Sequence, residues 1–156
     1  MNKKFARRPP RLHQIFRADP LYFVTICAYR RMRWLACDKI HFEFVHFGQE
    51  AERKFNIAVG RYVLMPDHAH LFVMGGLDFE LGQWVGMLKQ ALAKAGGRSG
   101  RGVRNWQEGC FDHVLRSDES YAEKWYYVRE NPARAGLVES WEDWPYQGEI
   151  VYIDRI

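Results

Sequence analysis

The sequence predicts an α+β fold: an antiparallel sheet with helices on one face, plus a further helix toward the C-terminus. Two observations support this prediction. Segments rich in β-branched and aromatic residues alternate with segments whose apolar residues recur at the helical period. Near the middle of the chain, two strand-like segments are separated by little more than the tight-turn signal Pro66-Asp67. The predicted order is therefore β-α-β-β-α-β, followed by the additional helix.

Each predicted element rests on its own pattern. The first strand, 21–27, is a run of apolar, aromatic and β-branched residues (LYFVTIC). Further strands are expected at 57–64, 68–74 and 110–115, and helices at 39–55, 81–95 and 119–130. Asp38 is expected to cap the first helix, and Pro132 is expected to end the third. This order of elements is that of the ferredoxin-like fold.

The chain has 156 residues, which is enough for one domain and short for two. Residues 1–18 are predicted to form a basic arm, and residues 19–156 a single domain whose tail, 139–156, docks on its body. No apolar run is long enough to cross a membrane. Three cysteines without a CxxC spacing are typical of reduced thiols. We therefore expect a cytoplasmic protein with no membrane partner.

The histidine pair His68 and His70 is the most informative feature for function. Alternate side chains of a strand point to the same face, so the two imidazoles are expected to lie side by side. The residues between and after them are apolar, which indicates a partly buried strand. Because histidine is costly to bury without a partner, a shared divalent cation is the simplest explanation.

A cation at this pair needs further ligands, and spacing alone leaves them open. Tyr127 with Asn131, and Tyr126 with Glu130, are both i,i+4 pairs on the predicted third helix. Either pair would hold a phenol beside the metal. A phenol in that place is a competent nucleophile toward a metal-bound phosphate. Periodicity does not choose between the two pairs.

Three other residues near these motifs have structural alternatives. Asp67 lies on the turn and is expected to point away from the histidines if the strand is regular. His113 is either a further ligand or a strand residue bonded to backbone. Asn131 precedes Pro132, a pattern that is also typical of a helix N-cap followed by proline at the first helical position.

The net charge of +4 and a pI near 9.0 favour an anionic polymer as partner. Two segments concentrate basic residues: the arm, and the glycine-rich loop 96–102 (GGRSGRG), whose amides and arginines can approach phosphates. A solvated tail and an exposed connector are the plain alternatives. The predicted DNA-binding residues are Lys3, Lys4, Arg7, Arg8, Arg11, Arg98, Arg101, Arg104 and Arg116.

Three ordered blocks carry a resemblance to a known family. Residues 62–72 (YVLMPDHAHLF) contain a histidine–hydrophobe–histidine element. Residues 106–116 (WQEGCFDHVLR) resemble the pattern WQ-x-G-x-x-DH-x-(I/L)R, and residues 127–138 (YVRENPARAGLV) resemble YI-x-x-NP-x-RAGLV. Together the blocks resemble the single-tyrosine HUH transposases, and the last is typical of the REP-associated tyrosine transposases.

This resemblance implies a fold, a site and a reaction. The fold is ferredoxin-like, Mg²⁺ or Mn²⁺ binds at His68 and His70, Tyr127 is the nucleophile, and Asn131 completes the metal site. The implied reaction is cleavage and rejoining of single-stranded DNA at hairpin-forming palindromic repeats through a 5′-phosphotyrosine, without ATP. The REP-associated branch is expected to act as a monomer with its own tyrosine helix.

Two other functions remain open from the sequence. A non-catalytic protein that binds DNA or RNA hairpins would rely on the basic residues and would form no covalent adduct. A small zinc hydrolase built on His68 and His70 would keep its activity without Tyr127, although the sequence offers no convincing third histidine or acidic ligand.

Overall fold

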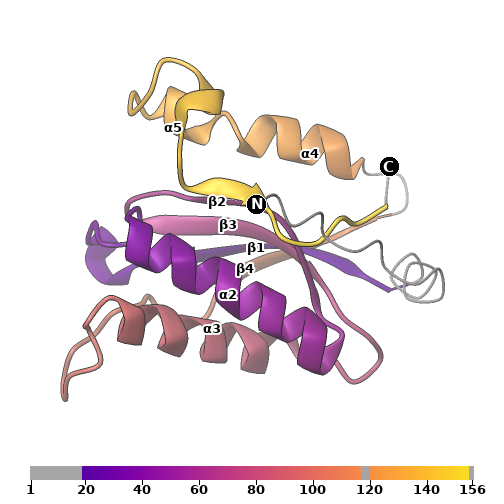
Figure 1. Cartoon of the computed structure of the whole chain (residues 1–156), viewed down its shortest axis with the longest axis horizontal. Coiled ribbons are helices and arrows are strands. Elements are labelled where there is room, and N and C mark those ends of the chain that lie inside the picture. Colours follow the sequence, from indigo (N-terminus) through magenta and orange to yellow (C-terminus); the bar gives the residue numbers. More distant parts are fainter. Residues whose placement is uncertain (1–18, 117–119, 155–156) are drawn as a thin grey trace, which may run out of the picture.

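The computed structural model describes residues 19–116 and 120–154, and these contain a five-stranded sheet of order β4-β1-β3-β2-β5 (Figure 1). Every neighbouring pair of strands is antiparallel. The strands are β1 (Leu21–Cys27), β2 (Ala58–Leu64), β3 (His68–Met74), β4 (Phe111–Leu115) and β5 (Gln147–Glu149). The predicted α+β fold class is confirmed, and β3 has the bounds that the sequence predicts.

The helices cover both faces of this sheet. Helices α2 (Asp38–Phe55) and α3 (Leu81–Ala95) connect the strands and lie together on one face (Figure 1). Helices α4 (Tyr121–Val128) and α5 (Asn131–Arg134) lie on the opposite face. The described residues also contain two short 3₁₀ segments, η1 (Tyr29–Arg31) and η2 (Trp141–Asp143). The two crossover helices therefore share a face as predicted, and the helix that bears the tyrosines is separate from them.

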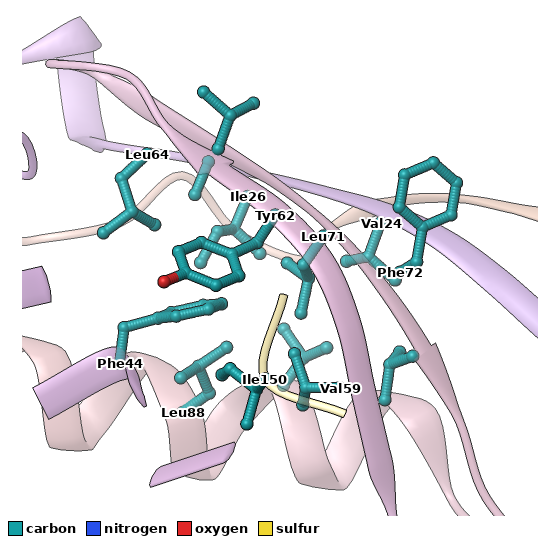
Figure 2. Packing of buried hydrophobic residues seen from close by; sticks show 14 of the residues in the cluster. Val24, Ile26, Phe44, Val59, Tyr62, Leu64, Leu71, Phe72, Leu88 and Ile150 are labelled. Atoms are coloured by element: carbon teal, nitrogen blue, oxygen red, sulfur yellow. The ribbon is translucent and has the colours of Figure 1, made fainter. Parts of the chain in front are cut away.

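The main core lies between the sheet and helices α2 and α3. Figure 2 shows Phe44 of α2 and Leu88 of α3 packed toward Tyr62 and Leu71 of the central strands. The rings of Phe44 and Tyr62 lie 4.6 Å apart between centroids. Each fully buried leucine or phenylalanine contributes about 1.5–3 kcal/mol relative to exposure, so this face supplies most of the stabilisation.

Helix α4 docks on the other face through one stripe of side chains. Tyr121, Trp125 and Val128 are buried and recur at helical spacing. The Tyr121 ring meets Phe72 edge-on at 4.8 Å, and its hydroxyl accepts a hydrogen bond from the Arg61 N–H at 2.8 Å. Gly60 allows this approach, since a Cβ there would lie 2.4 Å from the Tyr121 hydroxyl.

The ends of helices α2 and α4 differ from the predicted ones. Asp38 is the first residue of α2 rather than its cap, because Cys37 occupies the N-cap position without a side-chain hydrogen bond. Helix α4 is capped by Ser120, whose hydroxyl accepts from the Glu123 N–H at 3.2 Å, and it ends at Val128. The third helix is therefore shorter than predicted, since the chain turns before α5.

The C-terminal segment adds a strand that the sequence did not predict. Strand β5 pairs with β2, with Gly148 opposite Tyr62. Three residues that include a glycine show no β-strand pattern in the sequence. The segment becomes a strand because the edge of β2 offers it hydrogen-bonding partners. Nearby, the indole N–H of Trp144 donates to the Leu64 carbonyl at 2.9 Å, which docks the tail. In the described residues, no helix has the length and hydropathy needed to span a membrane.

Candidate metal and nucleophile site

The histidine pair lies on β3, on the face of the sheet that α4 covers. The ring centroids of His68 and His70 are 4.8 Å apart, with the planes near perpendicular at 80°. Antiparallel pairing sets Thr25 of β1 opposite His70 and Cys27 opposite His68. The prediction that the two imidazoles share a face is confirmed, and the register identifies their neighbours.

Each imidazole is held through its Nδ1 atom. The Nδ1 of His70 lies 2.7 Å from the Thr25 hydroxyl, and the Nδ1 of His68 lies 2.7 Å from Asp67 Oδ1. A carboxylate can only accept, so Asp67 selects the tautomer of His68 that carries its proton on Nδ1. This tautomer leaves Nε2 of His68 available to a cation, and Nε2 of His70 is available likewise when the Thr25 hydroxyl accepts from Nδ1. Such outer partners are typical of metal-binding histidines. The expectation that Asp67 points away from the pair is wrong.

The electrostatic surroundings keep His70 in the form that binds metal. Burial, followed by the positive charges of His68, Arg31, Lys124 and Arg134, lowers the pKa of His70 to about 3. The imidazole is therefore neutral at physiological pH, which is the form that coordinates a cation. Two of these charges lie on α4 and α5, so the tyrosine-bearing segment is close enough to act on His70.

Asp67 is kept as a carboxylate. Burial raises its pKa, but the hydrogen bond from His68 and the charges of His68 and Arg31 outweigh burial, and the net pKa is lowered. Arg31 contributes directly, because its Nε lies 3.0 Å from Asp67 Oδ2. An ionised Asp67 is the stronger acceptor for His68 and so fixes that ring more firmly.

Tyr127 lies on the exposed side of α4, with 67% of its surface accessible. The Arg134 guanidinium stacks on its ring at 4.3 Å, donates to the Tyr127 carbonyl at 2.9 Å, and donates to Asn131 Oδ1 at 2.5 Å. The structure therefore brings Tyr127 and Asn131 together through Arg134. Arg134 is not among the residues predicted for the site, although its spacing of three from Asn131 places it on the same helical turn.

The alternative tyrosine has a different environment. Tyr126 faces Arg129, whose guanidinium lies 4.5 Å from its ring and 4.0 Å from that of Trp141. Glu130 is the N-cap of α5, and its carboxylate lies 3.9 Å from the Arg129 Nε. Tyr126 and Glu130 thus both lie against Arg129, which also contacts Trp141 of η2.

Asn131 is not a helix cap. It is the first residue of α5, Glu130 precedes it as N-cap, and no cap hydrogen bond from a side chain is formed. Its Oδ1 is instead engaged by Arg134. His113 lies on β4 opposite Phe23. Within residues 19–116 and 120–154, no group of three histidine, cysteine, aspartate or glutamate side chains could hold a metal, so His113 does not complete the histidine pair.

The histidine and tyrosine segments approach each other over Phe23. The Lys124 ammonium of α4 lies 5.0 Å from the centre of the Phe23 ring. That ring stacks on His70 at 5.4 Å with an interplanar angle of 17°. Lys124 precedes Tyr127 by three residues and shares its side of the helix. The helix that carries the tyrosine is thereby seated beside the imidazole pair of the same chain.

The predicted DNA-binding residues lie in three parts of the chain: the loop after α3, the end of β4, and the N-terminal arm. Arg98, Arg101 and Arg104 lie in the loop after α3, where Arg98 bonds the Asn105 side chain at 3.0 Å. Arg104 lies over the Tyr29 ring at 5.7 Å, and Arg116 is exposed just after β4. The predictions on the arm, at Lys3, Lys4, Arg7, Arg8 and Arg11, lie outside the described residues.

The donor set fits a divalent cation that is completed by its substrate. Two imidazoles and an amide oxygen are fewer ligands than a protein-only site requires. Magnesium and manganese commonly take their remaining ligands from water and phosphate oxygens. The residues present are consistent with a cation held partly by His68 and His70 and partly by a phosphodiester.

An antiparallel sheet with paired histidines beside a tyrosine-bearing helix agrees with the family that the three sequence blocks resemble. The chain belongs to the family described as IS200-like transposases, whose sequence profile matches residues 20–114. The matched range includes both histidines and stops before Tyr127. The family gives the protein a transposase-like role in DNA processing.

Individual relatives agree with this assignment. A REP-associated tyrosine transposase of Haemophilus influenzae is 25% identical over 142 residues, which cover 84% of this chain and 80% of that protein. The structure of a REP-associated tyrosine transposase bound to a REP hairpin is similar with a TM-score of 0.64 at 20% identity, over 82% of this chain and 75% of the other. A Deinococcus radiodurans transposase structure gives a TM-score of 0.51 at 14% identity, over 83% and 97%. The resemblance found in the three sequence blocks is confirmed.

Proposed function

We propose that this protein cleaves and rejoins single-stranded DNA at hairpin-forming palindromic repeats through a 5′-phosphotyrosine on Tyr127. The observation that carries the proposal is the pair of imidazoles, each held through Nδ1 by a neighbouring side chain, on the sheet face that α4 covers. Hairpin DNA as substrate is supported by the structural relative bound to a REP hairpin.

His68, His70 and Asn131 would hold Mg²⁺ or Mn²⁺. When bound, such a cation withdraws charge from the phosphoryl oxygens and orients the ester. For Asn131 to serve, its Oδ1 must leave the Arg134 guanidinium or accept a second interaction, which a carbonyl oxygen with two lone pairs can do. The neutral state of His70 supports this role at physiological pH.

Tyr127 would supply the nucleophile. Its phenol oxygen attacks phosphorus, a Tyr127 O–P bond forms, and the bond from phosphorus to the 3′ oxygen breaks. The phenol loses one proton and the leaving 3′ oxygen gains one, so the products are a 5′-phosphotyrosine and a 3′-OH. The new ester keeps the energy of the old one, so attack by a 3′-OH rejoins the strand without ATP. Arg134, stacked on the ring, stabilises negative charge on the phenol oxygen.

A monomer would suffice for this reaction. Lys124 of α4 contacts Phe23, which stacks on His70, so the tyrosine helix lies over the histidine pair of its own chain. No second copy is needed to bring the two halves together. This supports a single chain acting with its own helix.

The decisive experiment is incubation with labelled single-stranded hairpin DNA and Mn²⁺, followed by denaturing electrophoresis. We expect a covalent protein–DNA adduct with the wild-type chain and with Tyr126→Phe, and none with Tyr127→Phe. Tyr126→Phe is the matched control because it is the adjacent exposed tyrosine.

Binding of the hairpin with no adduct in any divalent cation would instead favour the non-catalytic hairpin-binding function. Arg30 and Arg104, which have no carboxylate partner within residues 19–116 and 120–154, support that second candidate. Cleavage that persists in Tyr127→Phe would contradict the nucleophile and point to a metal-activated water.

A further inference from the structure

Arg31 is an arginine next to the histidine pair that the proposed reaction does not yet use. It lies in η1, directly after β1, and belongs to none of the three sequence blocks. Its Nε lies 3.0 Å from Asp67 Oδ2, and its Nη1 donates to the Cys27 sulfur at 3.0 Å. Asp67 in turn bonds His68 through its other oxygen. One carboxylate therefore joins the guanidinium and the imidazole.

The backbone at this point is unusual. Arg30 and Arg31 have φ values of 51° and 56°, so two successive residues with side chains adopt the left-handed region. Such conformations persist only where the surrounding structure enforces them, and they cluster at functional sites. The conformation turns the Arg31 side chain back toward Cys27 and the Asp67 turn.

The surrounding chain enforces this placement. The Ala28 N–H donates to the Asp67 carbonyl at 2.8 Å, and the Leu35 N–H donates to the Pro66 carbonyl at 3.0 Å. The η1 segment is thus tied at both ends to the turn that carries Asp67. Arg31 is fixed by the same hydrogen bonds that fix the entrance to β3.

The guanidinium nevertheless remains accessible. The Arg31 side chain is 54% exposed, whereas Asp67 is 23% exposed. Nε and Nη1 are engaged, and no hydrogen bond within residues 19–116 and 120–154 engages Nη2. A guanidinium braced on one edge presents its other N–H groups in a fixed direction, which is the geometry that recognises phosphate oxygens.

The neighbourhood is suited to an anionic strand. The loop after β1 carries Arg30 and Arg33, and it is hydrogen-bonded to the loop after α3, which carries Arg104. None of these arginines has a carboxylate partner among the described residues. Asp67 offsets part of the Arg31 charge, so the positive charge of this surface comes mainly from these neighbouring arginines. Arg31 contributes N–H groups whose orientation is fixed. Donors of this kind position a backbone without reading its sequence.

We propose that Arg31 is a phosphate-binding residue of this site. Asp67 and Cys27 brace its guanidinium beside His68, and its free N–H groups contact a phosphate of the bound DNA strand. This rests on the proposed function, because it assumes that a DNA strand runs past the histidine pair. The proposal gives η1 a phosphate contact in addition to those expected from the histidine pair and the basic loop.

The test separates phosphate contact from a merely structural role. A labelled single-stranded hairpin oligonucleotide is bound in EDTA, where no cleavage occurs, and its affinity is measured across a series of salt concentrations. Each phosphate contact to a single strand contributes about 0.7 to the slope of log affinity against log salt. We expect Arg31→Gln to weaken binding and to lower the slope by about that amount, and Arg31→Lys to keep the slope.

Two further variants make the result specific. Arg53→Gln removes an exposed arginine that is paired with Glu50 on α2, and it is expected to leave both affinity and slope unchanged. Glycine is compatible with the left-handed backbone at this position, so Arg31→Gly removes the side chain without adding strain. It should show the same lowered slope, and it provides the test if Arg31→Gln folds poorly.

An unchanged slope in Arg31→Gln and Arg31→Gly would overturn the proposal. The same is true if these variants weaken Mn²⁺ binding in the absence of DNA while the slope stays constant, because Arg31 would then act only through Asp67. Failure of the proposed function has a different signature: the wild-type chain binds the hairpin, Arg31→Gln lowers the slope, and no adduct forms with Mn²⁺. That result leaves the Arg31 assignment supported.

Discussion

The two halves of the site differ in how they are held. The histidine half lies within the sheet: His70 is largely buried, and both rings are bonded through Nδ1 to side chains set by strand register and by the preceding turn. The tyrosine half lies on an eight-residue helix, where Tyr127, the proposed nucleophile, is 67% exposed and contacts Arg134. For the proposed function, a rigid half that holds the cation and a looser half that carries the tyrosine suit a side chain that must reach a phosphate and later carry it.

The largest expected effect comes from two substitutions, one in the histidine half of the site and one in the tyrosine half. His70→Ala should weaken Mn²⁺ binding by more than about 100-fold, since loss of outer-sphere partners alone typically costs 10–100-fold. Adduct formation should disappear with it. Tyr127→Phe should abolish the adduct while leaving Mn²⁺ affinity unchanged. Metal titration and adduct gels on both variants test this, and a loss of Mn²⁺ binding in Tyr127→Phe would show that the halves are not separable.

The packing of α4 against the sheet can be disturbed by a substitution at Gly60. An added Cβ would lie 2.4 Å from the Tyr121 hydroxyl and 2.8 Å from Ile153 Cδ1, so Gly60→Ala should cost about 1–3 kcal/mol of unfolding free energy. We expect adduct formation to fall by a larger factor than Mn²⁺ affinity, because the tyrosine half is displaced. Gly86→Ala in α3 is the matched control: its Cβ meets nothing within 4 Å, and it should stabilise by up to about 1 kcal/mol. Denaturant unfolding measures both.

Thr25 tests whether its hydroxyl orients His70. Thr25→Val keeps the side-chain shape and removes the group 2.7 Å from Nδ1. We expect Mn²⁺ affinity to fall by about tenfold, as for other outer-sphere partners, and adduct formation to recover at high Mn²⁺ concentration. Thr25→Ser retains the hydroxyl and should behave like wild type. If excess Mn²⁺ does not restore activity, Thr25 has another role.

The smallest expected effect concerns Arg134. Arg134→Gln removes the stacked guanidinium from Tyr127, an interaction worth about 0.5–1 kcal/mol at an exposed position, which corresponds to about a two- to fivefold lower rate of adduct formation. Mn²⁺ affinity in the absence of DNA should not fall, because the substitution releases Asn131 Oδ1 and removes a positive charge that acts on His70. Single-turnover adduct kinetics check the rate. A rate equal to wild type would mean that Tyr127 is placed without Arg134.

Much of the fold and half of the site could be predicted from the sequence. Strand β3 and helix α3 have their predicted bounds, because strand and helix periodicities are local properties. The pairing of His68 and His70 on one face follows from strand alternation alone. The three-residue strand β5 could not be predicted, because it exists only where the edge of β2 accepts it.

The sequence by itself determined the order of elements, the shared face of the histidines, and the blocks that carry the family resemblance. Only the tertiary structure decided that Thr25 lies opposite His70, that Asp67 turns onto His68, and that α4 covers the histidine face. Strand register and helix docking depend on contacts between residues far apart in the chain, such as Arg61 with Tyr121. Side-chain spacing within one segment contains no information about such contacts, which is why the neighbours of the pair, Arg31 among them, became visible only in the folded protein.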